Sequence, residues 1–166
     1  TIGTYSLNSI LQEMLNPNNT ITTPGAHKFK VNDKVMQIRN NYDKKVYNGD
    51  IGKIEDIDLE ERQIKVNFSD NIVLYEFEEL DELVLAYSIS IHKSQGSEYS
   101  CVIVPIFTQH FMLLQTNLIY TALTRAKKLC IFIGQTKALA IALKNNKTIK
   151  RVTLLKELLT DDLQID

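Results

Sequence analysis

Hydrophobic and polar residues alternate through the middle of the chain. The stretches "DKVMQIRN", "IGKIEDID", "RQIKVNF" and "NIVLYEF" each follow this period of two, and Ile64, Val66 and Phe68 fall on one face of a half-buried strand. The dipeptide Asn48-Gly49 is a strong signal for a tight turn. Four or five short strands in about 50 residues predict a small β-barrel, of either an SH3-like or an OB-like type.

A helical pattern precedes this segment. Leu7, Ile10, Leu11 and Met14 are spaced as on one side of a helix, which ends before Pro17.

From residue 83 onward the pattern becomes that of an α/β layer. The run "LVLAYSISI" can form a strand, a helix, or one after the other. Ser88, Ser90 and His92 alternate with isoleucines and favour a strand, whereas Tyr87 and Ser94 would share a helix face. The continuous apolar runs "CVIVPIF" and "LCIFIG" predict buried parallel strands. "TNLIYTALTRAKK", "TKALAIALKNN" and "TLLKELL" predict helices.

Composition narrows the class of protein. Apolar residues make up 44% of the 166 residues, which is enough to bury a core. Lys and Arg total 19 against 20 Asp and Glu, so the formal net charge is −1. This balance excludes a highly basic nucleic-acid coat protein but not a local basic groove.

Other residue types add little chemistry. Cys101 and Cys130 lie inside apolar runs, so we expect buried thiols without a disulfide, and no metal-ligand spacing is present. No stretch approaches the roughly 20 apolar residues of a membrane span, and no signal peptide is visible, so we expect a cytoplasmic protein. The chain starts without Met, and we interpret it as a fragment or an excised domain.

The chain lacks a P-loop, the most common phosphate-binding motif of nucleotide-binding proteins. A P-loop requires a Gly, four residues, Gly-Lys and then Ser or Thr. The only Gly-Lys in the sequence is Gly52-Lys53, but Ile54 follows it and Tyr47 stands where the first Gly is needed. A site for phosphates and Mg²⁺ of this type therefore cannot form within the chain.

Two polar stretches lie beside the predicted parallel strands: "HKSQGSEY" and "TALTRAKK". Here the sequence resembles the second motor domain of RecD-like superfamily 1 DNA helicases. "YSISIHKSQGSEYSCVIV" is similar to motif V of that family and "NLIYTALTRAKKLCIFIG" to motif VI. "NGDIG" and its flanking strands resemble the family's SH3-like insert, and "LNSILQEMLNP" resembles the segment that precedes the insert.

The resemblance implies an α/β fold of the RecA-like, P-loop NTPase type: a partial second motor domain with a small SH3-like β-barrel inserted. It implies that residues 1–27 start the motor domain and that residues 28–82 form the barrel. Residues 83–146 would complete the motor domain with motifs V and VI, and residues 147–166 would form a C-terminal helix and tail.

The resemblance also implies a nucleotide-binding set. Arg125 matches the arginine finger, whose planar guanidinium stabilises phosphoryl charge and is worth about 10³–10⁵ in rate. Gly96 would let the backbone approach the nucleotide, and Glu98 would accept hydrogen bonds from the ribose. Gln95 would sense the nucleotide and link it to the DNA site. The structural alternatives are a helix-end cation for Arg125 and a helix C-cap for Gly96.

Residues before the finger have an implied structural role. Tyr120, Thr121 and Thr124 would pack and orient the helix, with core packing as the alternative for Tyr120. Lys127 and Lys128 would balance the dipole at the C-terminal end of that helix.

The remaining candidates face DNA. Ser90, His92, Lys93 and Ser94 resemble the DNA-facing half of motif V, since hydroxyl, imidazole and ammonium groups all donate to phosphates. The family usually has Thr where Ser90 stands, so the hydroxyl is kept.

The barrel adds a second group of candidates. Arg39 and Asn40, with Tyr42, Lys44 and Lys45, suit single-stranded DNA by phosphate attraction and base stacking. An ordinary solvated loop is the alternative.

The resemblance implies the C-terminal part of an ATP-dependent helicase that moves 5′ to 3′ on single-stranded DNA, in recombination, repair or conjugation. ATP and Mg²⁺ would bind only in the full-length protein, with an N-terminal RecA-like domain of the same chain, and the fragment alone would be inactive. The rival hypothesis is a non-catalytic DNA- or protein-interaction module that retains a helicase fold.

Overall fold

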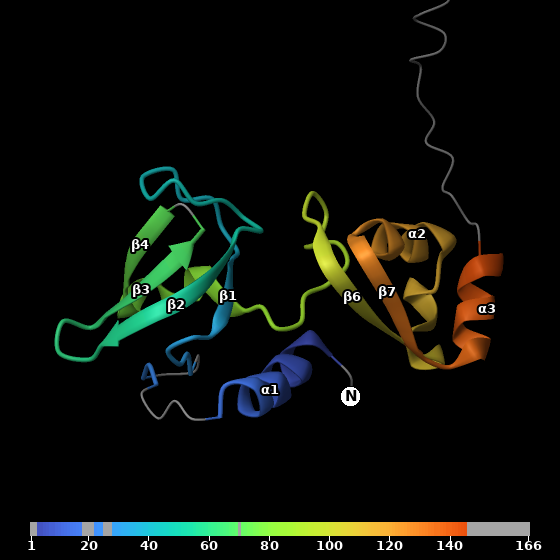
Figure 1. Ribbon diagram of the computed structural model, residues 1–166, viewed down its shortest axis with the longest axis horizontal. Helices are drawn as coiled ribbons and strands as arrows, with labels where there is room; N and C mark the ends of the chain where they lie inside the picture. Colours follow the sequence, from blue (N-terminus) through green and yellow to red (C-terminus); the bar gives the residue numbers. More distant parts are fainter. Residues whose placement is uncertain (1–2, 18–21, 25–27, 70, 146–166) are drawn as a thin grey trace, which may run out of the picture. The chain divides into compact units, whose positions relative to one another are not determined.

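The computed structural model describes residues 3–17, 22–24, 28–69 and 71–145 (Figure 1). These residues form two compact units, one that ends at Ser97 and one that starts at Glu98. The expected helix over "TLLKELL" and the tail 147–166 lie outside the described residues. None of the described helices is both long and apolar enough to cross a membrane.

The predicted first helix is confirmed as α1, Thr4–Leu15. Its buried positions are polar, however: Asn8 and Gln12 are buried, while Ile10 and Met14 are 53% and 71% exposed. This helix therefore packs against its own unit through amide side chains, and its apolar residues lie mostly at the surface.

An antiparallel five-stranded sheet confirms the predicted barrel strands (Figure 1). The strand order is β4-β3-β2-β1-β5, and a 3₁₀ helix η1, Phe77–Glu82, precedes the last strand. The predicted tight turn before β2 is present, with Gly49 at φ +102°. The strands are β1 (Lys34–Gln37), β2 (Ile51–Asp58), β3 (Gln63–Phe68), β4 (Asn71–Glu76) and β5 (Leu83–Leu85).

Alternate residues of these strands build one core. In β3, Ile64 and Val66 are fully buried and lie opposite Tyr75 and Val73 of β4. Gly52 completes the fit, because a Cβ there would come within 2.7 Å of the Val66 side chain. Gly52-Lys53 is thus strand backbone in the barrel. The buried cluster comprises Phe29, Val35, Val46, Ile54, Ile57, Ile64, Val66, Phe68, Val73, Tyr75, Leu80 and Leu83.

The strand expected over "LVLAYSISI" is only partly present. β5 ends at Leu85, residues 86–90 are irregular, and residues 91–96 form a turn. β5 ends where its antiparallel partner begins, since Leu85 pairs with Val35 and β1 starts at Lys34. At Ser88 a side chain takes the place of a strand partner. Asn8 Nδ2 donates to the carbonyl of Ser88 at 2.9 Å, and Asn8 Oδ1 accepts from the Ser88 backbone N–H at 2.7 Å.

The second unit has a parallel pair of strands with helices on one face (Figure 1). The prediction of parallel strands is confirmed, and so are the two helices that follow them. The elements are β6 (Tyr99–Ile106), the 3₁₀ helix η2 (Thr108–Leu113), α2 (Thr116–Thr124), β7 (Ala126–Gly134) and α3 (Thr136–Lys144).

The expected burial of β6 and β7 is wrong for one of their faces. Ile106 is buried with Leu114, Ala138 and Ala142 in a cluster that the helices complete. On the opposite face Ile103 is 60% exposed. A two-stranded sheet covered by helices on one side leaves its other side open, and no described residue of the second unit covers it.

Two smaller expectations are corrected in the same unit. Cys101 is exposed, because its side chain belongs to the open face, while Cys130 is half-buried; both are free thiols. Burial raises the pKa of the Cys130 thiol, and the neighbouring Cys101 adds to this. Lys127 and Lys128 lie in β7, so they do not balance the C-terminal end of α2.

The alternating burial predicts different costs for two neighbouring isoleucines. Ile64→Ala, at a fully buried position, should lower the free energy of unfolding by about 2–5 kcal/mol. Ile72→Ala, at a position 54% exposed on the adjacent strand, should change it by only about 0.5 kcal/mol. Urea unfolding of the chain measures both, and equal losses would contradict the strand register.

Candidate functional site

Most of the motif V candidates lie in one turn, residues 91–96, at the end of the first unit. The turn is held by its own serines. Ser90 Oγ accepts from the Lys93 backbone N–H at 3.3 Å, and the buried Ser94 donates its hydroxyl to the carbonyl of Ile91 at 2.7 Å. In this structure Ser94 is thus a turn-forming residue.

The exposed side chains of this turn are His92, Lys93 and Gln95. Gly96 has φ +84°, and a Cβ there would meet no atom within 4 Å. The helix C-cap alternative for Gly96 is wrong, because no helix precedes it. The turn therefore presents a cation, an imidazole and an amide beside a backbone that a ligand can approach closely.

A buried carboxylate that sequence reasoning missed anchors the chain just before this turn. Asp33 is fully buried, and its Oδ1 accepts from the Tyr87 hydroxyl at 2.9 Å and from Asn16 Nδ2 at 2.7 Å. Burial, together with the hydrogen bond to this carboxylate, raises the pKa of Tyr87 to about 12. A detectable signal was the spacing of Asn8, Gln12 and Asn16, one amide every four residues along the helix.

In the second unit, Glu98 and Arg125 lie near the start of the two parallel strands. The Tyr99 backbone N–H donates to the carbonyl of Arg125 at 2.8 Å. Glu98 forms an ion pair with Lys127 at 3.3 Å, and both side chains are more than half exposed. Arg125 is half-buried and caps the C-terminal end of α2 with helical dihedral angles.

The residues before Arg125 behave in two ways. Thr121 Oγ1 donates to the carbonyl of Asn117 at 2.8 Å, and Thr124 Oγ1 donates to that of Thr121 at 3.0 Å. Both threonines thus bond back to their own helix. Tyr120 is 67% exposed, so core packing does not account for it here.

The barrel candidates lie in the loop between β1 and β2. Arg39 forms an ion pair with Asp81 at 3.0 Å, and both side chains are more than half exposed. Asn40 Oδ1 accepts from the backbone N–H of Asn48 at 2.9 Å, which closes the loop. An exposed ion pair such as Arg39–Asp81 contributes little to stability, so Arg39 can exchange Asp81 for another partner at low cost.

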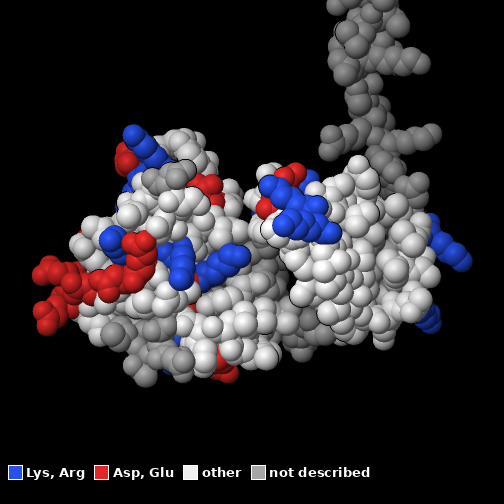
Figure 2. Space-filling view, in the orientation of Figure 1, with Lys and Arg blue, Asp and Glu red and all other residues white. Residues whose placement is uncertain are grey.

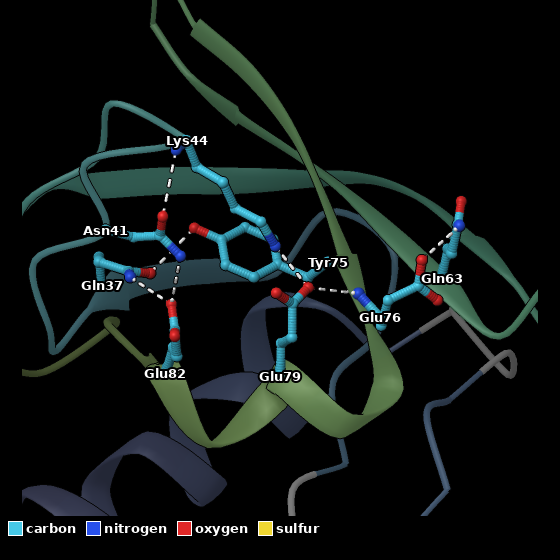
Figure 3. A network of polar contacts seen from close by, with 8 residues as sticks. All are labelled: Gln37, Asn41, Lys44, Gln63, Tyr75, Glu76, Glu79 and Glu82. Carbon is cyan, nitrogen blue, oxygen red and sulfur yellow. Dashed lines mark hydrogen bonds and ion pairs between the residues drawn. The ribbon is translucent and has the colours of Figure 1, made fainter.

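Lys44 is held by the barrel (Figure 3). Its ammonium forms an ion pair with Glu79 and lies 4.4 Å from the centroid of the Tyr75 ring. Burial acts to raise the pKa of Glu79, but the hydrogen bonds from Lys44 and the Glu76 backbone N–H outweigh it and hold this pKa below its usual range. Lys44 therefore fastens the loop to η1.

A second set of contacts fastens the same loop (Figure 3). The buried Tyr75 hydroxyl donates to Gln37 Oε1 at 2.9 Å, and Gln37 Nε2 donates to Glu82 at 2.8 Å. Glu82 also accepts from Asn41 Nδ2 at 3.3 Å. Burial and nearby carboxylates, Glu82 foremost, raise the pKa of Tyr75.

The fastened loop presents an aromatic pair of which sequence reasoning found only one member. The rings of Tyr42 and Tyr47 meet edge to face, with centroids 6.0 Å apart. They are 73% and 47% exposed. The spacing in "YDKKVYNGD", across the tight turn, was the available signal. Exposed rings of this kind can stack on bases.

Charge is unevenly distributed. On the face drawn in Figure 2, the Lys and Arg side chains of the first unit are interspersed with Asp and Glu. In the second unit a charged group lies at one end of the surface over β6 and β7, and the rest of that surface is nearly free of charged side chains. Among the described residues, no group of three His, Cys, Asp or Glu could hold a metal ion.

Two family models match the chain, and together they cover more than half of it. The SH3 domain of ATP-dependent RecD-like DNA helicases matches residues 7–68, and the UvrD-like helicase C-terminal domain matches residues 85–133.

Relatives extend the match over almost the whole chain. The ATP-dependent RecD2 DNA helicase of Deinococcus radiodurans is 31% identical over 157 residues, which are 95% of this chain and 22% of that protein. The RecBCD enzyme subunit RecD of Haemophilus influenzae is 29% identical over 160 residues, 96% of this chain and 23% of that protein. The chain thus spans less than a quarter of the length of these relatives.

Solved structures agree on the fold. The crystal structure of Pif1 helicase from Bacteroides in complex with ADP-AlF3 and ssDNA has a TM-score of 0.61 at 16% identity, covering 98% of this chain and 44% of that one. Pif1 helicase from Candida albicans has a TM-score of 0.51 at 24% identity, covering 89% and 40%. The expected fold class, a RecA-like α/β domain with an SH3-like barrel, is confirmed.

The fold and the two matched segments define a piece of a helicase motor. Within that class, the chain is similar to RecD-like DNA helicases, whose SH3 domain model matches residues 7–68 and two of whose members match almost the whole chain.

Because Lys44 holds the β1–β2 loop to η1 through Glu79, removal of its ammonium group should lower stability in a pH-dependent way. Because its pKa is lowered on folding, Glu79 stabilises the fold above about pH 4.5 and loses this effect as the pH falls through its folded pKa. Lys44→Met should therefore cost about 0.5–1 kcal/mol at pH 7, and the difference from wild type should shrink below pH 4.5.

Lys45→Met is the matched control, because Lys45 is the exposed neighbour. Urea unfolding of the chain at pH 7 and pH 4 checks both variants. Equal behaviour of the two variants would show that the Lys44–Glu79 pair does not fasten the loop.

Proposed function

We propose that the parent protein is an ATP-dependent DNA helicase that moves 5′ to 3′ on single-stranded DNA in the cytoplasm, in repair, recombination or conjugation. This chain is its C-terminal part. The observation that carries the proposal is the presence of two features in the segment matched by the helicase C-terminal model. These are the exposed polar turn at residues 91–96 and the arginine at the end of α2.

The proposed domain division follows the same family. Residues 1–27 start the second motor domain, residues 28–82 form the SH3-like barrel, and residues 83–146 complete the motor domain. The buried barrel cluster, which begins at Phe29 and ends at Leu83, supports the barrel limits. β5 carries the sheet three residues beyond them.

The proposed nucleotide side uses Gln95, Gly96, Glu98 and Arg125. Arg125 is the arginine finger, and its guanidinium stabilises the negative charge that develops on the transferred phosphoryl group of ATP. Glu98 accepts hydrogen bonds from the ribose. To do so it gives up its ion pair with Lys127, which costs little because that pair is exposed. Gln95 is exposed and carries both a donor and an acceptor, as a sensor between two ligands requires.

The proposed DNA side uses the other residues of the same turn and the barrel loop. His92 and Lys93 are exposed donors for phosphates, while Ser90 and Ser94 contribute by holding the turn. In the barrel, the Arg39 and Asn40 region carries the exposed tyrosine pair, on which bases of single-stranded DNA would stack.

A preceding RecA-like domain of the same chain is the proposed partner. It supplies the P-loop and the carboxylates for Mg²⁺, which this sequence lacks. The open apolar face of β6 and β7 supports a longer parent, because exposed apolar surface of this kind marks a contact with further protein. The relatives, more than four times as long, have room for that domain.

A second candidate is a non-catalytic interaction module. Two cations of the barrel loop, Arg39 and Lys44, are already in ion pairs, which weakens the electrostatic case for DNA at the barrel. On this alternative the exposed tyrosines dock a protein, and Arg125 is a structural residue.

Arg125→Ala in the parent protein separates these candidates. Turnover of ATP stimulated by single-stranded DNA should fall about 10³-fold or more, since the finger acts on the transition state, while DNA affinity stays unchanged. Lys128→Ala is the control, because it removes a neighbouring exposed cation.

The outcome reads in three ways. Loss of turnover confined to Arg125→Ala supports the finger, and equal effects of both variants would contradict it. A wild-type parent without DNA-stimulated turnover would favour the interaction module. The isolated chain should hydrolyse no ATP in the same assay. Appreciable turnover there would contradict the proposal that a preceding domain supplies the P-loop and the carboxylates for Mg²⁺.

A further inference from the structure

The inward face of α1 is a row of amides that contacts main chain from distant parts of the sequence. Asn8 pairs with both backbone groups of Ser88. One helical turn on, Gln12 Nε2 donates to the carbonyl of Lys28 at 2.9 Å. After another turn, Asn16 Nδ2 donates to the carbonyl of Val31 at 2.8 Å. The amides thus bind the irregular stretch that leaves the barrel and the segment that enters it.

Asp33 joins these contacts into one cluster. Its Oδ2 accepts from Gln12 Nε2 and from the Lys30 backbone N–H, the latter at 2.7 Å, and its Oδ1 accepts from Asn16 and Tyr87. No ion pair of Asp33 is found among the described residues. A fully buried carboxylate held by neutral donors is costly to disturb, because each lost donor leaves its charge less well compensated.

The cluster has a direct consequence for the turn at residues 91–96. Asn8 holds the backbone of Ser88, and Asp33 holds Tyr87 through its side-chain hydroxyl, only a few residues before the turn. The chain before it is fixed as well, since the Ala86 backbone N–H donates to the carbonyl of Lys34 at 2.7 Å. The turn thus begins from an anchored position on the barrel unit.

We propose that Asn8, Asp33 and Tyr87 are positioning residues that couple the barrel and α1 to the turn at residues 91–96, so that these parts move as one body. This coupling would serve the proposed helicase function, because a barrel that moves with bound DNA would then move the motif V turn, residues 91–96, with it. The coupling itself rests on the hydrogen bonds of Asp33 and Asn8 and stands independently of that function.

Tyr87→Phe in the parent protein tests the coupling, because it removes one hydroxyl and keeps the ring. Hydrogen–deuterium exchange of the backbone amides of Ser88, Lys93, Ser94 and Gln95 should become about tenfold faster, the effect of losing a hydrogen bond to a charged acceptor. DNA-stimulated ATP turnover should fall severalfold.

Tyr75→Phe is the matched control. It removes a buried tyrosine hydroxyl from the same unit, but that hydroxyl donates to Gln37 within the barrel. Exchange at residues 88–95 should stay at the wild-type rate. Asn8→Ala is a second test, since it removes both bonds to Ser88 from a helix that otherwise stays intact, and it should reproduce the Tyr87→Phe pattern.

The outcomes are distinct. Faster exchange at residues 88–95 in Tyr87→Phe and Asn8→Ala, but not in Tyr75→Phe, supports the coupling. Unchanged exchange in the first two variants, or the same increase in all three, would overturn it. If exchange separates the variants while the wild-type parent shows no DNA-stimulated turnover, the coupling stands and the proposed helicase function fails.

Discussion

The buried carboxylate of Asp33 determines how the first unit is arranged. Asp33 is fully buried and is held by amide, hydroxyl and backbone donors. Burying such a charge is costly unless donors converge on it, and here the donors come from α1, from the segment that enters the barrel and from the chain that leaves it. The position of the carboxylate therefore determines where three separate stretches of chain meet.

The barrel provides the rigid support for this arrangement. Its core is apolar and closely fitted, as the approach of Gly52 to Val66 shows. A second polar cluster, around Tyr75, Glu79 and Glu82, holds the β1–β2 loop on a different part of the barrel. Polar contacts thus fix two candidate functional segments, the chain before the turn at residues 91–96 and the β1–β2 loop, while apolar packing holds the strands of the barrel. This division explains why the exposed loop residues need not themselves contribute to stability.

Much of the fold could be predicted from the pattern of the chain. Alternation located four barrel strands, since Ile64, Val66 and Phe68 share a face, and continuous apolar runs located the two parallel strands. The errors have physical causes. β5 ends early because its partner β1 starts at Lys34, and at Ser88 the Asn8 side chain replaces a strand partner. The burial of β6 and β7 was overestimated because a pattern cannot reveal that one face stays open.

The candidate site could be predicted only through the resemblance to a family. No spacing rule marks Arg125 or Gly96, and the contacts of Asp33 depend on long-range pairing that sequence alone does not fix. The structure adds that Ser94 forms its turn, that Glu98 pairs with Lys127 and that Tyr47 joins Tyr42. These details separate residues that shape the site from those available to a ligand.

A crystal structure of the parent protein, bound to single-stranded DNA and a transition-state analogue of ATP hydrolysis, would test the central claim most directly. We expect the Arg125 guanidinium to lie within about 3 Å of the group that mimics the transferred phosphate, with His92 or Lys93 at the DNA backbone. An Arg125 side chain beyond hydrogen-bonding reach of that group would contradict the assignment of this arginine as the finger.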